Sequence, residues 1–348
     1  MSHNAENPDI LYNEYSKKLA EKYGYKDWMI SRFLKFVPNT ELLLEYIEKN
    51  KSSYPEYIRA NSLKMDSVSL KKRLEEKGYL IEKTILDEVF KIDKARNANN
   101  PNNDKKTNLP TIGSTLEYLK GYYYIQDLSS CIAVGELEID DRNCTTVLDM
   151  AASPGGKTTY MAQKMNNAGN IIACEPNPKR IPSLLFNLSR CDVKNTTIFN
   201  MPGEDVEKLG IKFDRVLLDA PCSCEGIVTK DETRKKSRNL KDIEICSVKQ
   251  RNLIKSAFRV LKPGGKMVYC TCTFAPEENE MVVDELIRDN KDNDMELEPV
   301  RYGVDGLTEY GDRQFSKELR HTKRLYPHIH HTNGFFIAKL RKKQSQVV

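Results

Sequence analysis

Two short motifs place cysteines at every second position. Cys222 and Cys224 lie in the run DAPCSCEG, which ends an apolar stretch, and Cys270 and Cys272 lie in the run YCTCT, which ends another. A cysteine at a strand end beside a ligand cleft suits a nucleophile whose pKa is lowered by its surroundings. Core packing is the ordinary role of any single cysteine, because this residue type is commonly buried. The paired pattern favours thiol chemistry.

Four clustered cysteines also suggest zinc. Structural zinc sites usually have two to four residues between paired cysteines, whereas one residue separates each pair here. We therefore predict no metal site. All nine cysteines fall between Cys131 and Cys272. Because the first nine residues lack the apolar core of an export signal, we expect reduced thiols in a cytoplasmic protein.

A glycine-rich loop follows the apolar strand predicted at 146–150. Glycine lets a ligand approach the backbone closely, and the N-terminus of the following helix attracts negative charge. Ligands of open α/β sheets lie beyond the carboxyl ends of the strands. The candidate cofactor-binding residues of this loop are Ala151, Ala152, Ser153, Pro154, Gly155, Gly156 and Lys157.

Two kinds of nucleotide site compete for this loop. A P-loop requires G-x-x-x-x-G-K-[ST]; Gly156, Lys157 and Thr158 match it, but Ala151 replaces the first glycine. An adenosine cofactor favours an acidic residue at the end of the second strand, where it accepts hydrogen bonds from ribose hydroxyls, and Glu175 stands there, about 20 residues beyond the loop. The sequence favours the adenosine cofactor, with a nucleotide hydrolase as the alternative.

Catalytic thiols beside an adenosine cofactor indicate one reaction in particular. Carbon 5 of cytosine is a weak nucleophile, and a thiolate that adds to carbon 6 turns the ring into an enamine. Carbon 5 then attacks the methyl group of S-adenosyl-L-methionine, a base removes the carbon 5 proton, and the thiolate leaves. Asp219 is expected to hold the polar edge of the base, and Lys157 to stabilise charge near the ring.

The elements that position these residues fall into two predicted domains. From residue 126 to 343, short apolar strands alternate with helices, which predicts an α/β, doubly wound, mostly parallel sheet of the Rossmann type. Its expected strands are 146–150, 170–174, 213–219, 266–270 and 335–340, with a helix at 248–261. Residues 1–125 are expected to form a smaller domain of helices (10–57) and an α/β unit (57–93), with a flexible loop at 96–110. Residues 344–348 form a tail.

Composition limits the class of protein. The 348 residues carry 55 Lys and Arg against 50 Asp and Glu, a net charge of +5, and the pI is near 8.5. This mild excess permits an anionic partner without requiring one. Hydrophobic residues make up 39%, which supports a core, and no apolar run approaches the ~20 residues of a membrane span. We expect no membrane contact and infer no obligate protein partner.

The motifs together resemble the Nop/Sun family of RNA cytosine-5 methyltransferases. The runs LDMAASPGGKT, DAPCS and TCT are similar to the family's cofactor loop and its two cysteine motifs. The runs YIRANSLK, GYYYIQD and GFFIA are similar to parts of its recognition domain, its domain entry and its C-terminal strand. The resemblance covers most of the chain. It implies a class I methyltransferase fold with an N-terminal RNA-recognition domain, and methyl transfer from S-adenosyl-L-methionine to carbon 5 of cytosine in RNA.

The resemblance also implies roles for individual cysteines. Cys272 is the thiol that attacks carbon 6, and Cys222 is the thiol that assists product release. Cys224 and Cys270 depart from the family's pattern, which usually has glycine and serine there. We interpret both as tolerated small residues.

By the same resemblance, the cofactor site extends beyond the loop 151–157. Glu175 binds the ribose, and Arg180 occupies a basic position five residues later. Glu204 contacts the adenine, and Asp219 lies at the methionine end or at the target base.

Three basic segments are candidates for RNA contact, and Tyr122–Tyr124 are candidates for base stacking. The segments are 230–241, the group Arg320, Lys323 and Arg324, and the tail 341–343. We favour tRNA as substrate because the compact chain has no large appended domain, with ribosomal RNA as the alternative. A catalytically inactive RNA-binding protein is a third hypothesis, and retention of Cys222 and Cys272 counts against it.

Overall fold

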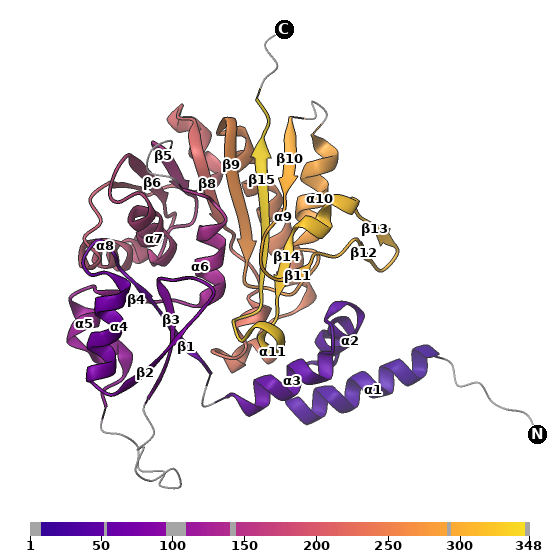
Figure 1. The fold of residues 1–348 in the computed structure, drawn as a ribbon. Helices are drawn as coiled ribbons and strands as arrows, with labels where there is room; N and C mark the ends of the chain where they lie inside the picture. Colours follow the sequence, from indigo (N-terminus) through magenta and orange to yellow (C-terminus); the bar gives the residue numbers. More distant parts are fainter. Residues whose placement is uncertain (1–7, 52–53, 95–108, 140–143, 291–293, 345–348) are drawn as a thin grey trace, which may run out of the picture.

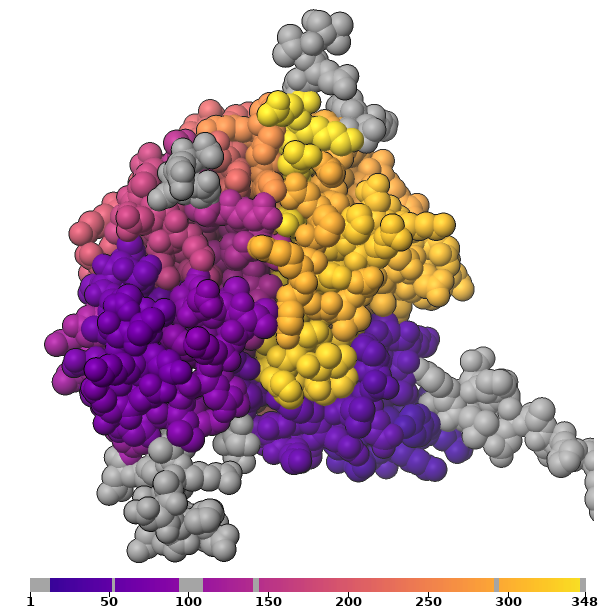
Figure 2. All heavy atoms as spheres, in the orientation of Figure 1, coloured from indigo at the N-terminus to yellow at the C-terminus, as the bar shows by residue number. Residues whose placement is uncertain are grey.

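Three helices open the computed structural model, which describes residues 8–51, 54–94, 109–139, 144–290 and 294–344. They are α1 (Pro8–Tyr23), α2 (Asp27–Phe36) and α3 (Thr40–Lys49). The apolar face of α2 buries Met29, Ile30 and Phe33 against Phe274 and Tyr326 from the C-terminal half. The indigo helices therefore lie against the yellow end of the chain (Figures 1 and 2). The helices expected within residues 10–57 are present.

A small antiparallel sheet follows, with strand order β2-β3-β1-β4. Its elements are β1 (Glu56–Ala60), α4 (Ser67–Glu76), β2 (Tyr79–Lys83), β3 (Val89–Lys94), the short α5 (Leu116–Leu119) and β4 (Tyr123–Ile125). Asp66 caps α4 by accepting a hydrogen bond from the Ser69 amide at 2.9 Å, as a β-region N-cap residue should. The flexible loop expected at 96–110 lies almost entirely outside the described residues.

The large sheet has the order β11-β14-β15-β9-β8-β5-β6-β7, and β10 pairs with β15. Five adjacent strands are parallel to one another: β5 (Thr146–Asp149), β6 (Asn170–Cys174), β7 (Thr196–Phe199), β8 (Phe213–Asp219) and β9 (Leu261–Thr271). The antiparallel strands are β10 (Met295–Glu298), β11 (Val304–Asp305), β14 (Lys323–Leu325) and β15 (Phe335–Lys342). A separate hairpin pairs β12 (Glu309–Tyr310) with β13 (Arg313–Gln314). The mostly parallel, doubly wound sheet is the predicted fold class.

Helices cover both faces of this sheet (Figure 1). One face packs against α9 (Leu240–Arg259) and α10 (Glu280–Asp289), and the other against α6 (Leu128–Gly135), α7 (Gly156–Lys164) and α8 (Ile181–Arg190). A short α11 (Pro327–His330) precedes β15. The helix predicted at 248–261 begins eight residues earlier, because Asn239 and Asp242 form a capping box at Leu240. Among the described residues, no helix has the length and apolar character of a membrane span.

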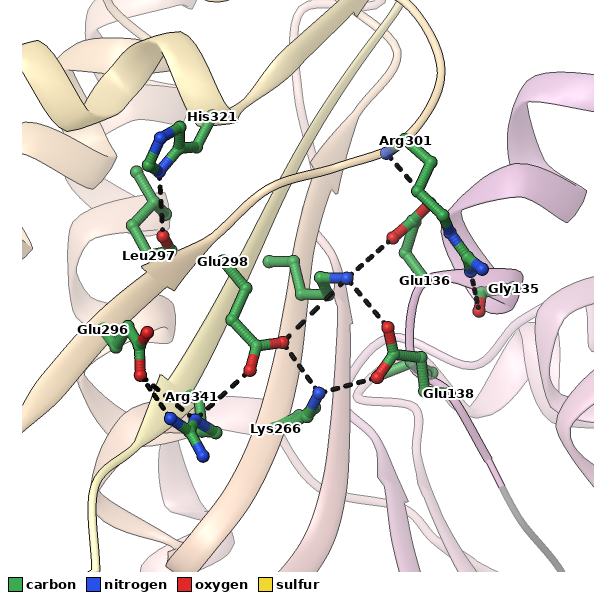
Figure 3. Close-up of polar contacts among 12 residues, drawn as sticks. Gly135, Glu136, Glu138, Lys266, Glu296, Leu297, Glu298, Arg301, His321 and Arg341 are labelled. Carbon is green, nitrogen blue, oxygen red and sulfur yellow. Dashed lines mark hydrogen bonds and ion pairs between the residues drawn. The ribbon is translucent and has the colours of Figure 1, made fainter.

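An ion-pair network joins the strands near the start of β9 (Figure 3). The Lys339 amino group lies 3.0 Å from Glu136 and 2.9 Å from Glu138, and Lys266 lies 2.6 Å from Glu138 and 2.8 Å from Glu298. Lys339 and Glu136 are buried. The network therefore ties the end of α6 to three strands.

Candidate active site

The order of the parallel strands reverses between β5 and β8, and open α/β sheets have a crevice at such a point. From β5 the chain proceeds to β6 and β7 on one side, and then returns to β8 and β9 on the other. At such a switch point the loops leave in opposite directions, so a ligand fits beyond the carboxyl ends of the strands. That edge is the lower end of β9 in Figure 1. Asp149 ends β5 and Asp219 ends β8 at this edge.

The glycine-rich loop packs closely against its neighbours. Gly155 has a φ of +104°, a conformation that favours glycine, and a Cβ there would lie 3.0 Å from Leu184. A Cβ on Gly156 would lie 3.2 Å from the ring of Tyr124 in β4. The loop therefore needs both glycines for packing, and its turn places the first turn of α7 beside β4.

Backbone hydrogen bonds hold the rest of the predicted loop. The Ala151 amide donates to Asp149 at 3.3 Å, and the Ala152 amide donates to the Cys174 carbonyl at 3.0 Å. The Pro154 carbonyl accepts from the Asn187 amide group at 2.9 Å. These bonds connect β5, β6 and α8 through one loop.

Sequence reasoning did not single out Asp149. Its carboxylate is buried and accepts hydrogen bonds from the Thr158 hydroxyl at 2.7 Å and from the Ala151 amide. Burial raises its pKa to about 6. Its position at the end of the strand before the glycine-rich loop could have marked Asp149 as a site residue in the sequence. Asp149 fixes the loop to the first turn of α7.

The predicted ribose-binding residue, Glu175, follows β6 and is buried. One carboxylate oxygen accepts from the Asn177 amide at 2.8 Å, and the other lies 3.4 Å from the Arg180 guanidinium. Arg180 also donates to the Ser153 carbonyl at 2.7 Å, while the Ser153 hydroxyl donates to the Arg180 carbonyl at 2.9 Å. Arg180 thus joins Glu175 to the glycine-rich loop, and the ribose contact stays a prediction.

Glu204 lies in a short 3-10 helix (Gly203–Leu209) that begins beside the same loop. A Cβ on Gly203 would lie 2.8 Å from the Met150 carbonyl oxygen, so this helix starts against the end of β5. The Glu204 side chain is half-buried and pairs with no other side chain in the described part of the chain. It remains available to a ligand, and its adenine contact stays a prediction.

Lys157 and Asp219 face each other across the crevice. The Lys157 amino group lies 2.6 Å from Asp219 Oδ2 and 5.6 Å from the centre of the Phe335 ring. Burial acts to lower the pKa of Lys157, but the charge of Asp219 raises it above its usual value. Lys157 therefore keeps its positive charge although its side chain is largely shielded from solvent.

Three of the four motif cysteines come together at the carboxyl ends of β8 and β9. The sulfurs of Cys222 and Cys272 lie 3.3 Å apart, and those of Cys222 and Cys224 lie 3.8 Å apart. All three side chains are half-buried. Cys270 is buried and points to Asp219 instead, with a sulfur–oxygen distance of 3.6 Å. The strand register, which pairs Asp219 with Cys270, aligns the two motifs.

The pKa values of the three thiols depend on one another. Hydrogen bonds with Cys224 and Cys272, together with burial, raise the pKa of Cys222. The pKa of Cys272 is also raised, because the hydrogen bond with Cys224 and burial outweigh the opposing hydrogen bond with Cys222. Hydrogen bonds from both partners, followed by the charges of Arg234 and Arg238, lower the pKa of Cys224 despite its burial. Negative charge in this cluster therefore favours Cys224.

A polar layer that sequence reasoning missed holds the two cysteine motifs. Glu278 accepts hydrogen bonds from the Ser223 amide and the Gln250 side chain, both at 2.9 Å. The hydroxyls of Ser223 and Thr273 lie 2.8 Å apart. Burial raises the pKa of Glu278 to about 7. The acidic run PEENE, two residues after the second motif, was the signal in the sequence that could have indicated this layer.

The N-terminal helices reach the same layer. Arg32 of α2 forms ion pairs with Glu225 at 3.3 Å and with Glu277 at 2.5 Å. Glu225 is buried next to Cys224 in the chain and accepts from Thr273 at 3.3 Å. The first helices therefore support the cysteine motifs directly.

The structure corrects several expected RNA contacts. Arg324 is buried and pairs with Glu280, so it is a core residue. Arg341 pairs in register with Lys266, five residues before the end of β9, and β15 is antiparallel to β9, so the segment 341–343 leads away from the cysteines. Tyr123 is buried, with its hydroxyl donating to the Ile112 carbonyl at 2.6 Å, and does not present its ring for stacking.

The segment 230–241 lies beside the site. Arg238 donates to the Ser223 carbonyl at 2.9 Å, and the buried Lys235 pairs with Glu48 of α3 at 3.6 Å. Lys236 and Lys241 are exposed, and neither forms an ion pair with another described residue. Within this segment, Arg238 therefore stabilises the first cysteine motif, and Lys236 and Lys241 present positive charge to the solvent.

The doubly wound sheet, the glycine-rich loop at the switch point and the helices on both faces define a class I methyltransferase fold, here with a cysteine cluster at its crevice. Residues 137–341 match the family described as "16S rRNA methyltransferase RsmB/F", and the chain belongs to this family. The predicted Nop/Sun resemblance and fold class are confirmed, and membership of a methyltransferase family counts against the nucleotide-hydrolase alternative.

Solved structures support the same fold over nearly the whole chain. A "Methyltransferase Homolog Protein" from Pyrococcus horikoshii is 35% identical with a TM-score of 0.80, covering 97% of this chain and 99% of that one. "NSun6 from Pyrococcus horikoshii with SFG" is 27% identical with a TM-score of 0.72, covering 96% and 98%.

Curated relatives carry ribosomal RNA in their names. The Caenorhabditis elegans "26S rRNA (cytosine-C(5))-methyltransferase nsun-1" is 38% identical, covering 95% of this chain and 49% of its own length. The Homo sapiens "28S rRNA (cytosine(4447)-C(5))-methyltransferase" is also 38% identical, covering 96% and 40%. A "Ribosomal RNA small subunit methyltransferase F" from Vibrio parahaemolyticus is 36% identical, covering 83% and 57%. This chain spans about half the length of these relatives.

Proposed function

We propose that this protein transfers a methyl group from S-adenosyl-L-methionine to carbon 5 of cytosine in ribosomal RNA. One observation carries the proposal: the Cys222 and Cys272 sulfurs lie 3.3 Å apart in a crevice that also holds the Lys157–Asp219 pair. Family membership supports the reaction class.

The residues of the crevice fit the proposed methyl donor. The first backbone N–H groups of α7 have no partner within the helix, so they suit the carboxylate of the methionine part of the methyl donor. The unpaired Glu204 carboxylate beside the loop suits the exocyclic amino group of an adenosine, which donates hydrogen bonds. When bound, S-adenosyl-L-methionine supplies an electrophilic methyl group. Loop 151–157, Glu175 and Arg180 are proposed to hold it.

The cysteines would carry the covalent steps. A Cys272 thiolate forms a bond from its sulfur to carbon 6 of cytosine, which places the electron pair at carbon 5 for methyl transfer. Loss of the carbon 5 proton to a base then breaks the carbon 6–sulfur bond and restores the ring. The assignment of attack to Cys272 and of release to Cys222 rests on the family resemblance.

Lys157 and Asp219 would bind and polarise the base. The Lys157 ammonium would donate to the cytosine carbonyl oxygen O2 or the ring nitrogen N3, which gain negative charge as the thiolate adds. Asp219, at 2.6 Å, holds the lysine in place and keeps it charged. Asp219 can also accept from the amino group of the cytosine.

Ribosomal RNA takes the place of the tRNA expected from the sequence. That expectation rested on the compactness of the chain, whereas the curated relatives are named for ribosomal RNA. The exposed Lys236 and Lys241, in the segment next to the first cysteine motif, suit the phosphate backbone of either RNA.

The test is transfer of a labelled methyl group to unmodified ribosomal RNA and tRNA transcripts, followed by nucleoside analysis. We expect 5-methylcytidine in ribosomal RNA with the native chain and with Cys246→Ala, a half-buried thiol on α9 outside the cluster. The variant Cys272→Ala should give none. Label in tRNA alone would contradict the substrate, and no label in either RNA would contradict the reaction.

A further inference from the structure

We propose that the sulfurs of Cys222, Cys224 and Cys272 form a binding site for one thiophilic divalent cation, Zn²⁺ or Cd²⁺. Among the described residues, these three are the group whose ligand atoms converge, all within 4.8 Å of one another. The binding itself is independent of the proposed function. Only its consequence, that an occupied site cannot methylate, depends on that function.

The sulfur positions match the size of such an ion. Zinc–thiolate bonds are about 2.3 Å long, so two sulfurs on a tetrahedral zinc lie about 3.8 Å apart. The measured separations are 3.3 Å for Cys222 and Cys272 and 3.8 Å for Cys222 and Cys224. The Cys222 and Cys272 sulfurs would have to move apart by a few tenths of an ångström to reach this separation. The Cys224 and Cys272 sulfurs, which lie within 4.8 Å, would have to approach by up to about 1 Å.

The two loops that carry the sulfurs are bound to each other. The Gly226 amide donates to the Cys272 carbonyl at 2.9 Å, and the Ser223 and Thr273 hydroxyls lie 2.8 Å apart. These contacts hold the sulfurs together before any ion arrives, which reduces the entropic cost of binding. All three cysteines are half-buried, so an ion can enter from the crevice.

The surrounding charge suits a three-thiolate site. Three thiolates and a divalent cation carry a net charge of −1, and binding releases up to three thiol protons to the solvent. The positive charges of Arg234 and Arg238 act on Cys224, and Lys157 and Cys272 also interact electrostatically. Lys157 and Arg234 are already paired with Asp219 and Asp231, so these groups offset the negative charge of the complex only in part.

The prediction that these motifs hold no metal came from the spacing within each cysteine pair. The converging set takes two cysteines from one motif and one from the other, so that spacing rule does not apply to it. Cys270 stays outside because it points to Asp219. With three protein ligands the fourth position is open, as in exchangeable rather than structural sites. An ion here would occupy the two thiols assigned to catalysis.

The test is titration of the full chain with Cd²⁺ without oxygen or added thiol, followed through the ultraviolet cadmium–thiolate band, with Zn²⁺ measured against a chromogenic chelator. Cys224→Gly removes one sulfur at a position whose φ of +63° suits glycine. Cys246→Ala is the matched control. We expect one equivalent to bind the native chain and the control alike, with affinity at least tenfold weaker in Cys224→Gly.

Two results would overturn the site: no saturable binding of one equivalent, or equal affinity in Cys224→Gly. Circular dichroism checks that the variant folds, and Cys224→Ser replaces it if it does not. In methyl-transfer assays, Zn²⁺ should inhibit the native chain reversibly, and Cys224→Gly should need at least tenfold more. Metal binding without methyl transfer would contradict only the proposed function, and methyl transfer without metal binding would contradict only the metal site.

Discussion

The polar groups near the two ends of β9 differ in how many ion-pair partners they have within the protein. Toward the amino-terminal end, Lys266 of β9 and Lys339 of the paired strand β15 are surrounded by carboxylates, and Lys339 alone contacts Glu136 and Glu138 within 3.0 Å. At the carboxyl-terminal end, the half-buried Cys272 packs against the apolar core, and its sulfur lies 3.3 Å from that of Cys222. Charged groups whose partners all lie within the protein contribute to folding. Thiols that keep unused hydrogen-bonding or ligand positions can bind a substrate and react.

The same physical rule explains both ends. A buried charge is costly unless it is paired, so the buried Lys339 needs its carboxylates. Partial burial of a thiol costs little free energy, so the cysteine cluster can stay without ion-pair partners beside an open crevice. The comparison predicts that substitutions at the carboxyl end mainly affect chemistry, and that substitutions at the amino end mainly affect stability.

The largest effect is expected for Cys272→Ala. Loss of the nucleophile should lower methyl transfer by at least ~10³-fold, as for other covalent catalysts. The free energy of unfolding should change by no more than about 1 kcal/mol, because the side chain is half-buried. Rate assays and denaturant unfolding measure the two quantities. Native-like turnover would assign the attack to another thiol.

Cys222→Ala should stop the reaction after one event. If Cys222 assists release, the Cys272–carbon 6 bond should persist, and a protein–RNA adduct should survive a denaturing gel. The double variant Cys222→Ala, Cys272→Ala is the control and should give no adduct. Free, fully methylated RNA without adduct would remove the release role from Cys222.

At the other end of β9, Lys339→Met should destabilise the protein by about 3–5 kcal/mol. The substitution removes the buried one of the two cations that contact the buried Glu136. The other, Arg301 at 3.1 Å, has a side chain that is 68% exposed and screened by solvent, so most of the cost of breaking a buried ion pair remains. Denaturant unfolding measures the loss, and methyl transfer below the unfolding transition should keep a native KM. A large KM change with native stability would contradict the assigned division of roles.

Glu278→Gln tests the polar layer through pH. A carboxyl whose pKa is raised from 4.5 to about 7 binds its proton more tightly in the folded state. Its stabilising contribution is therefore complete below pH 4.5 and is lost as pH rises through 7. The variant lacks this loss, so from pH 5 to pH 8 its stability relative to the native chain should rise by about 1–3 kcal/mol.

The exposed Glu318 provides the control for this measurement, since Glu318→Gln should leave the pH profile of unfolding unchanged. Parallel profiles for Glu278→Gln and the native chain would show that Glu278 titrates normally. Unfolding by denaturant at several pH values supplies the data.

The smallest effect is expected for Arg341→Met. Arg341 pairs with Glu296 and Glu298 in the same network, but its side chain is 42% exposed. Solvent screens such pairs, so the loss should stay below about 1 kcal/mol. Comparison with Lys339→Met isolates the effect of burial within one network. Equal losses for the two variants would contradict that explanation.

Local patterns predicted much of the fold and of the candidate site. The parallel strands that carry the site and the glycine-rich loop follow from residues adjacent in the chain, and the structure shows them at the expected places. Charge along the sequence was a weaker guide. Arg324 and Lys323 are neighbours, yet one is buried against Glu280 and the other pairs with Asp305 at the surface. Which side of a strand each residue faces depends on partners elsewhere in the chain.

The sequence by itself determined the family motifs, the order of strands and helices, and the presence of two cysteine pairs, because each depends on short stretches of chain. Only the tertiary structure decided which cysteines meet. Residues two apart on a strand face the same side, so alternation alone would direct Cys270 and Cys272 alike. Cys270 lies inside β9, where its buried sulfur points to Asp219. Cys272, just past the end of β9, is free to approach Cys222 on the neighbouring loop. That side-chain direction and the parallel pairing of β8 with β9 make a three-sulfur cluster from two separate motifs.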